Sequence, residues 1–331
     1  MKTTGIMLQT LIVPCGCRCR YCLLSWDGSC IGADYQRSEA YAKRFHDWVM
    51  EHRPELSFNF CFGYSMDHPQ LIRAIDFMNS IGSVSGRFLQ MNGFAFRSPE
   101  EIEHLMKELA AHGVEAINFT FYGNEATHDR FAGRTGDHHF LLSMAMAAIR
   151  AGIAVSAGIP LTTENIRQTD ELVSDLRDSG IAETRLFIPH EEGRGRLCSD
   201  IRCSEKELDM LNSETGKLLN RRVYRTEAEW MQSDDVLPET KRSLLISLTK
   251  ENIDRMSDFA EVIRQVEASD DAYYAAVPGF RELLDRYGDP HGTKLYGKRD
   301  LYQHYQKIYL KGSGISVTDV TDERFSGTRR F

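Results

Sequence analysis

The chain has 331 residues, of which 42% are hydrophobic and 27% are charged, so it is long enough to bury a large core. Its 40 basic and 48 acidic side chains give a net charge of −8, which does not favour nucleic acid as a partner. No apolar run approaches the roughly 18 residues of a membrane-spanning helix, and the apolar stretch before Cys15 lacks the form of a signal peptide. We therefore expect a cytoplasmic protein with no membrane or nucleic-acid partner.

Strand-like and helix-like patterns alternate along the chain as far as His190. The predicted strands cover 8–13, 56–62, 87–91, 116–121, 153–159 and 184–188, and the predicted helices cover 37–52, 69–81, 99–112, 138–151 and 166–179. This alternation predicts consecutive βαβ units, hence a parallel sheet with right-handed crossovers. Because the repeat is about 30 residues, we predict an α/β fold with a partial, open (β/α)6 TIM-like barrel. A doubly wound sheet is the alternative, since periodicity alone does not separate the two.

The pattern changes after Gly195. Segments 204–223 and 237–268 are charged and read as helical without clear strands, and a further helix over 272–286 is broken at Pro278-Gly279. A last strand is predicted over 315–320. We therefore predict two parts, a core barrel over 1–196 and a mostly helical C-terminal extension over 197–331 that covers the substrate.

Four of the eight cysteines lie within eight residues, directly after the first predicted strand. Such clustering in a large chain indicates a metal site rather than a disulfide framework. Cys15, Cys19 and Cys22 have Cys-x3-Cys-x2-Cys spacing, which can bind three irons of a [4Fe–4S] cluster and leave the fourth iron open. A zinc site with Cys17 as the fourth ligand, or thiols without metal, are the alternatives.

With these residues, the chain resembles the radical S-adenosylmethionine (radical SAM) superfamily. Its hallmark is this cysteine spacing with an aromatic residue before the last cysteine, which is Tyr21 here. The resemblance covers about residues 8–195 and implies two cofactors, a [4Fe–4S] cluster on Cys15, Cys19 and Cys22 and S-adenosylmethionine (SAM) on the open iron.

The fourth strand carries the most informative part of the resemblance. Thr120-Phe-Tyr-Gly, followed by His128-Asp-Arg-Phe and then Gly133-Arg134, is similar to a run typical of radical SAM enzymes that modify peptides. This likeness implies that Thr120, with Arg134 or Arg130, holds the carboxylate of SAM, a task that suits a guanidinium.

Other SAM contacts follow from the ends of the remaining strands. The family's Gly-Gly-Glu-Pro motif is replaced after the second strand, so the contact to the SAM amine is expected from main chain there. The residues that the resemblance assigns to cofactor binding are Tyr21, Phe62, Gly63, Tyr64, Asn92, Thr120, Arg130, Arg134, Gly158, Ile159 and Asn165.

Cys198 and Cys203 follow the sixth strand and are the last cysteines of the sequence. Peptide-modifying members usually carry a cysteine-rich C-terminal domain, called SPASM or twitch, for which this sequence has no cysteines. Either Cys198 or Cys203 could donate a hydrogen atom to a substrate radical, and the alternative is that both are small buried side chains.

The resemblance implies an enzyme that cleaves SAM to a 5′-deoxyadenosyl radical, with an electron from a flavodoxin- or ferredoxin-like donor. The motifs favour a ribosomally made peptide as the substrate, which would be epimerised or crosslinked. A small metabolite in a biosynthetic pathway is the alternative substrate. A third hypothesis, from another class, is a non-catalytic zinc-binding scaffold.

Overall fold

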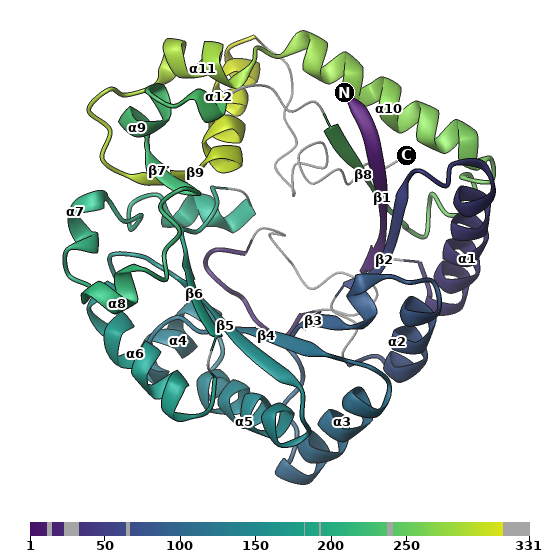
Figure 1. Ribbon diagram of the computed structural model, residues 1–331, viewed down its shortest axis with the longest axis horizontal. Helices are drawn as coiled ribbons and strands as arrows, with labels where there is room; N and C mark the ends of the chain where they lie inside the picture. The colour runs from purple at the N-terminus through teal and green to yellow at the C-terminus, as the bar shows by residue number, and fades with distance from the viewer. Residues whose placement is uncertain are drawn as a thin grey trace.

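The structure is a computed structural model that describes residues 1–11, 15–22, 33–63, 67–181, 183–191, 193–236 and 241–313. Strands line the inside of a ring, and helices cover its outside (Figure 1). This arrangement confirms the predicted α/β barrel and is inconsistent with a doubly wound sheet, which has helices on both faces.

Seven parallel strands form the wall of the ring in two sheets. The first sheet has the order β2-β1-β8 and the second has the order β3-β4-β5-β6. Their bounds are β1 Lys2–Leu11, β2 Ser57–Gly63, β3 Phe88–Gln90, β4 Ala116–Thr120, β5 Ala154–Pro160, β6 Glu183–Phe187 and β8 Lys241–Ser247. All six strands predicted before His190 are therefore confirmed within the described residues. β1 begins at Lys2, earlier than expected, and residues 12 and 13 of its predicted range lie outside the described residues.

β8 corrects the prediction that 237–268 is helical without strands. Residues 241–247 pair in parallel with β1, and Leu8 lies opposite Ile246. The side chains of β8 alternate between buried and less buried positions, and Leu244 and Ile246 join the main core. The sequence pattern was ambiguous because the strand is short and begins with Lys241 and Arg242. The extension thus supplies a seventh strand to the barrel wall.

The helices of the same part of the chain confirm the predicted positions to within two residues at each end. They are α1 Tyr35–His52, α2 Leu71–Ser80, α3 Pro99–Ala111, α5 Asp137–Arg150 and α6 Ile166–Asp178. Ser98 caps α3 through a capping box with Glu101, as its Ser-Pro-Glu-Glu start indicates. One helix was missed. α4, Glu125–Ala132, is only eight residues long, and it lies inside the motif that follows β4.

The two faces of the strands differ in chemistry. On β1, Ile6 and Leu8 are 1% and 0% exposed and belong to the core beneath the outer helices. Side chains on the opposite face, toward the inside of the ring, are more polar and less buried. Gln9 donates to Ser247 at 3.0 Å across the β1–β8 pair, and Asn118 donates to Ser156 at 2.8 Å across the β4–β5 pair. The inner wall is therefore lined partly by amides and hydroxyls.

The remaining elements of the extension gather beside β6 and outside β1. They are α7 Glu205–Leu208, α8 Ser213–Gly216, β7 Tyr224–Thr226, α9 Glu227–Met231, α10 Phe259–Ala276, α11 Phe280–Tyr287, β9 Leu295–Gly297 and α12 Lys298–Gly312. The helix break at Pro278-Gly279 is confirmed, because α10 ends before Pro278 and α11 begins after Gly279. The predicted strand over 315–320 lies outside the described residues.

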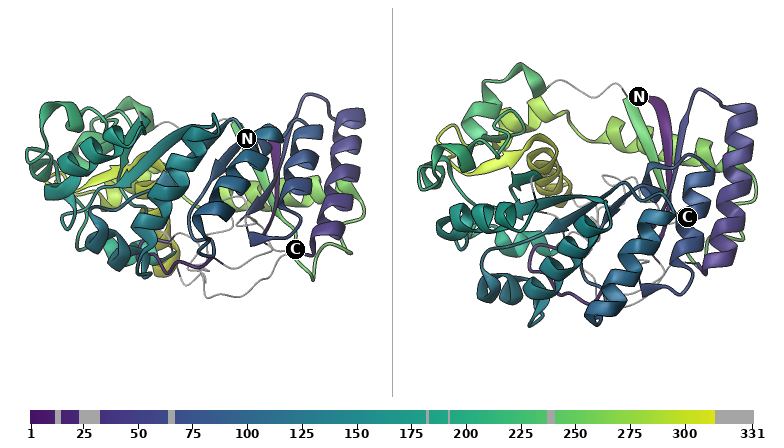
Figure 2. Two further views of the ribbon diagram at one scale, coloured as in Figure 1. Left: turned by 90° about the horizontal axis from the view of Figure 1, so that it is seen from below. Right: turned by 60° about the horizontal axis from the view of Figure 1, so that its bottom comes forward.

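The extension has a hydrophobic core of its own, which includes Trp230, Phe280 and Tyr305. β7 and β9 pair antiparallel beside it, and the views in Figure 2 place this group at the end of the molecule opposite α1. Leu186 of β6 donates its N–H to Leu218 O at 3.1 Å. The extension therefore continues the wall where β6 would otherwise be an open edge. None of the described helices is both long and apolar enough to cross a bilayer.

Candidate cofactor site

The cysteine loop, residues 15–22, is held by backbone hydrogen bonds to three other loops. Gly16 N–H donates to Gly93 O at 2.6 Å, and Arg18 N–H donates to Ala132 O at 2.7 Å. On its far side, Arg194 N–H donates to Cys22 O at 2.9 Å. The loop after β1 is thus fixed by the segment that follows β3, by the last residue of α4 and by the segment that follows β6, at the edge where barrel enzymes place their chemistry.

The side chains of the loop fall into two groups. Cys15, Cys19 and Cys22 are partly exposed, whereas Cys17 is buried and 4% exposed. The Cys17 thiol donates to the carboxylate of Asp137 at 3.6 Å, and it also lies beside the thiols of Cys15 and Cys19. The Cys17 side chain therefore lies beside two other thiols of the loop while its own thiol reaches Asp137.

The donor set of the loop fits an iron–sulfur cluster. Among the residues that the structure describes, no three His, Cys, Asp or Glu side chains converge on one point as the ligands of a single metal ion do. A [4Fe–4S] cluster does not require such convergence, because each thiolate binds a different iron. Three partly exposed thiols on one short, hydrogen-bonded loop meet that requirement.

Gly93 makes room for the first cysteine of the loop. It has φ +81°, a region that other residues adopt only with strain, and a Cβ there would overlap Cys15 Sγ. The sequence singled out Asn92-Gly93 only by resemblance. The structure gives a physical reason for glycine at this position, since any side chain would displace Cys15.

The ends of β3 and β4 are joined through Asn92. Its amide donates to Thr120 O at 3.1 Å, and its Oδ1 accepts the Thr120 N–H at 2.9 Å. The Thr120 hydroxyl accepts from Gln90 Nε2 at 3.3 Å. Asn92 therefore positions Thr120, and the Thr120 hydroxyl keeps a proton that it can donate to an acceptor.

The two candidate arginines differ in their surroundings. Arg134 lies 3.2 Å from Asp137 Oδ1, and its guanidinium carbon is 3.7 Å from the ring centre of Phe96. Arg130 is 62% exposed and forms an ion pair with Glu164 at 3.5 Å. The Arg134 guanidinium is thus already paired with Asp137. The Arg130 side chain is mostly exposed, so an added anionic ligand can reach it.

Gly158 and Ile159 lie near the end of β5, and Asn165 directly precedes α6. The Asn165 side chain is 1% exposed and donates to Tyr122 O at 2.8 Å and to Pro160 O at 2.7 Å. A Cβ at Gly158 would lie 3.3 Å from the ring of Phe187, and Ile159 is fully buried. Asn165 therefore links the segment after β4 to the end of β5 by hydrogen bonds. The absence of a side chain at Gly158 leaves space beside the ring of Phe187.

The remaining predicted contacts lie at β2 and at the end of the cysteine loop. Phe62 is 5% exposed and stacks on Tyr35 with ring centres 4.9 Å apart. Gly63 is the last residue of β2, and Tyr64 lies outside the described residues. The Tyr21 ring meets Tyr122 edge-on with 5.0 Å between the ring centres, so it packs against the segment that follows β4.

Cys198 and Cys203 are both buried, at 2% and 0% exposure. Cys198 packs with Tyr122, Phe131 and Ile201, close to the cysteine loop, and Cys203 belongs to the main core. Burial raises the pKa of the Cys198 thiol to about 11 and that of Cys203 to about 12. Both thiols therefore stay protonated, but a hydrogen-donor role requires a path from either one to the substrate.

A charged network joins the end of β6 to the extension. Arg202 is 3% exposed, and its guanidinium lies 3.1 Å from the Asp300 carboxylate and 3.6 Å from that of Glu191. Glu191 Oε2 also lies 2.6 Å from His304 Nδ1. From the sequence, Glu191 is expected in a solvated loop or beside a substrate amine. The network could not be foreseen, because Asp300 and His304 come much later in the chain.

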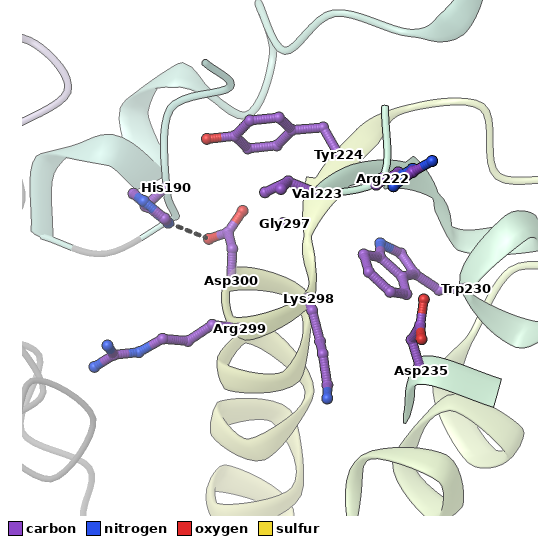
Figure 3. Close-up of a pocket in the computed structure, with 10 residues that line it drawn as sticks. All are labelled: His190, Arg222, Val223, Tyr224, Trp230, Asp235, Gly297, Lys298, Arg299 and Asp300. Atoms are coloured by element: carbon purple, nitrogen blue, oxygen red, sulfur yellow. Dashed lines mark ion pairs between the residues drawn. The ribbon is translucent and has the colours of Figure 1, made fainter. Parts of the chain in front are cut away.

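A cavity of about 450 Å³ lies beside this network (Figure 3). His190, Tyr224, Trp230 and Asp300 contribute to its lining, and the Asp300 carboxylate points toward His190. Its volume is in the range of small-molecule and side-chain pockets. The extension and the end of β6 thus form a concave surface together.

The Glu191–His304 pair makes stability depend on pH. For Glu191, burial raises the pKa, but the hydrogen bond with His304 and the charge of Arg202 outweigh it and lower the pKa to about 2. For His304, burial lowers the pKa, but the hydrogen bond with Glu191 outweighs it and raises the pKa. A raised histidine pKa stabilises the fold below the unfolded value of about 6.5, and this contribution is lost as pH rises through the folded pKa.

We therefore expect the urea midpoint of unfolding to fall between about pH 6 and pH 8.5, and we expect His304→Gln to reduce that fall. The effect is modest because His304 is 37% exposed. His104→Gln, at an exposed position on α3, is the matched control and should leave the pH dependence unchanged. An equal fall in wild type and His304→Gln would contradict the assignment.

By sequence, neither a protein-family model nor a curated protein matches the chain. Solved structures do match. SuiB from Streptococcus suis, bound to its precursor peptide SuiA, aligns with 74% of this chain at a TM-score of 0.52 and 10% identity. SuiB bound to S-adenosylmethionine aligns with 73% at 0.51 and 11%. HemN, the coproporphyrinogen III oxidase of Escherichia coli and a radical SAM enzyme, aligns with 67% at 0.44 and 13%.

The alignments cover 58%, 59% and 54% of those proteins, so this chain matches less than two thirds of their length. At such low identity, the similarity concerns the fold. The chain shares the α/β barrel fold of SuiB, and an α/β barrel is the fold that the resemblance drawn from the cysteine motif implies.

Proposed function

We propose that this chain is a radical SAM enzyme. The observation that carries the proposal is the position of the Cys15, Cys19 and Cys22 loop, which follows β1 at the functional edge of a parallel barrel with the radical SAM fold. A loop with this spacing, held by three neighbouring loops and partly exposed, has the form of a cluster-binding segment.

In this proposal, Cys15, Cys19 and Cys22 hold a [4Fe–4S] cluster. Thr120 donates a hydrogen bond from its hydroxyl group to the carboxylate of SAM, and Arg130 or Arg134 pairs with the same carboxylate through its guanidinium. The greater exposure of Arg130 favours it over Arg134, whose guanidinium already lies beside Asp137. Main-chain carbonyl groups around Gly63 and Tyr64 accept hydrogen bonds from the amine of SAM. The residues that shape the rest of the site are Tyr21, Phe62, Asn92, Gly158, Ile159 and Asn165.

When bound, the cluster and SAM supply a one-electron cleavage that yields a 5′-deoxyadenosyl radical, with an electron from a flavodoxin- or ferredoxin-like protein. The chain's own residues orient the cofactors and exclude water and stray hydrogen donors. The buried side chains around Tyr122 and Phe131 close the space behind the cysteine loop. Cys198 and Cys203 remain predicted hydrogen donors.

For the substrate, we propose a ribosomally made peptide that is epimerised or crosslinked. The likeness of the β4 motif and the fold shared with SuiB, which was solved with a precursor peptide, support a peptide. The amides and hydroxyls on the inner wall suit a polar backbone. Residues 1–196 together with β8 would form the core barrel, and the rest of residues 197–331 would form the part that covers the substrate. The cavity of about 450 Å³ instead favours the alternative, a small metabolite.

The test is anaerobic reconstitution of the full chain with iron and sulfide, followed by SAM and a reductant. We expect broad absorption near about 400 nm, as iron–sulfur clusters give, and formation of 5′-deoxyadenosine. Full occupancy by zinc, with no such absorption and no cleavage, would instead support the scaffold hypothesis. Transfer of deuterium from labelled peptides or metabolites into 5′-deoxyadenosine, read by mass spectrometry, separates the two substrate classes.

A further inference from the structure

A buried carboxylate, that of Asp137, contacts the cysteine loop through Cys17. Asp137, the first residue of α5, is 1% exposed. Its Oδ2 lies 3.1 Å from His128 Nε2, and its Oδ1 lies 3.2 Å from Arg134 Nη1. A carboxylate taken out of water is costly unless it is paired, and these two partners supply the pairing. When Arg130 is the residue that meets the SAM carboxylate, none of these three groups is needed to bind SAM.

The orientation of His128 is fixed by the backbone. Its Nδ1 accepts the N–H of Tyr122 at 3.2 Å, so the ring proton resides on Nε2, which donates to Asp137. His128 is fully buried, and it connects the segment after β4 with the start of α5. Asp129, the next residue, accepts from the N–H groups of Gly136 and His138 and so fixes the start of α5 as well.

The Asp137 oxygen that contacts His128, Oδ2, also faces Cys17. The Cys17 thiol donates to Oδ2 at 3.6 Å and lies beside the thiols of Cys15 and Cys19. The loop therefore presents four thiols to a cluster that takes three. Spacing alone does not exclude Cys17, since it is only two residues from Cys15 and from Cys19. The contact with Asp137 is what distinguishes Cys17 from the others.

We propose that Asp137, held by His128 and Arg134, is a positioning residue that engages Cys17 and so leaves Cys15, Cys19 and Cys22 to bind iron. This inference rests on the proposed function for the identity of the cluster. The engagement of Cys17 itself is a property of the apo chain. This side-chain contact anchors the loop in addition to its backbone hydrogen bonds to Gly93 and Ala132.

The first test uses the apo chain and needs no cluster. Iodoacetamide labelling, read per cysteine by mass spectrometry, should be slower at the buried Cys17 than at the partly exposed Cys19 and Cys22. Asp137→Asn removes the ionised acceptor and should raise the rate at Cys17 roughly tenfold. Asp300→Asn, which also neutralises a buried carboxylate but far along the chain, should not change that rate. Equal labelling of Cys17, Cys19 and Cys22 in wild type would overturn the proposal.

The second test uses reconstituted protein and electron paramagnetic resonance of the reduced cluster. Asp137→Asn should give a lower iron content and a mixed signal, because Cys17 then competes for iron. Asp137→Asn with Cys17→Ala should restore the single wild-type signal. A double variant as heterogeneous as Asp137→Asn would mean that Asp137 supports only the fold, which overturns the proposal. If wild type binds zinc and no cluster, the proposed function fails and the selection of ligands fails with it, whereas the labelling result still reports whether Cys17 is engaged.

Discussion

Cys19→Ala is expected to abolish both the iron–sulfur absorption and the cleavage of SAM. Cys19 is the middle ligand of the proposed set, and its partly exposed thiol lies on a loop fixed by Gly93, Ala132 and Arg194. Loss of one of three ligands leaves an incomplete set, since the remaining thiol of the loop, Cys17, already donates to Asp137. The loss of activity should exceed the roughly 100-fold that removal of an outer hydrogen-bonding partner costs a metal site.

The matched control is Cys61→Ala. Cys61 is also a partly exposed free thiol, but it lies on β2 outside the loop. Iron content by colorimetric assay and 5′-deoxyadenosine by chromatography should stay near wild type in this variant. If Cys19→Ala retains a wild-type amount of cluster, the assignment of Cys15, Cys19 and Cys22 as ligands is wrong.

Gly93→Ala is expected to remove most of the cluster without a change to any cysteine. The added Cβ would overlap Cys15 Sγ and lie 3.5 Å from Gly16 N, so Cys15 must move. The hydrogen bond from Gly16 N–H to Gly93 O, at 2.6 Å, ties the same two loops together and leaves little room for adjustment. Iron content after reconstitution should fall roughly tenfold.

Gly152→Ala separates this steric effect from backbone strain. Gly152 has φ +83°, nearly the value at Gly93, but a Cβ there meets nothing within 4 Å. Alanine in this left-handed conformation should cost about 1 kcal/mol of unfolding free energy at either position. Only Gly93→Ala should also lose iron. An equal loss of cluster in both variants would mean that destabilisation, and not contact with Cys15, accounts for the result.

The regular part of the fold could be predicted because its signals are local. Strand and helix positions as far as Ile188 follow from alternation, from caps such as Ser98 and from glycines such as Gly152 at helix ends. β8 was missed because its character as a strand depends on pairing with β1, which lies at the other end of the described chain. α4 was missed because eight residues give too short a periodic signal.

The site shows the same division between local and distant information. The cysteine spacing predicted a cluster loop without help from the structure. The role of Asp137 could not be read from the sequence, because it depends on contacts with Cys17, which is 120 residues away, and with His128. The steric need for glycine at position 93 likewise depends on a thiol from a different loop. Such contacts form only in the folded chain, where the loops after β1 and β3 meet α4 and the start of α5.

The pairing of β8 with β1 constrains the order in which the protein can mature. β1 carries the cysteine loop at its end, and one of its two neighbours, β2, is available once synthesis has passed Gly63. The other neighbour, β8, includes Ile246, which pairs with Leu8 and is made much later. Contacts so distant in sequence form late in folding. The cysteine loop therefore receives its full support only after β8 has been synthesised, and we expect the proposed cluster to be inserted stably only after that point.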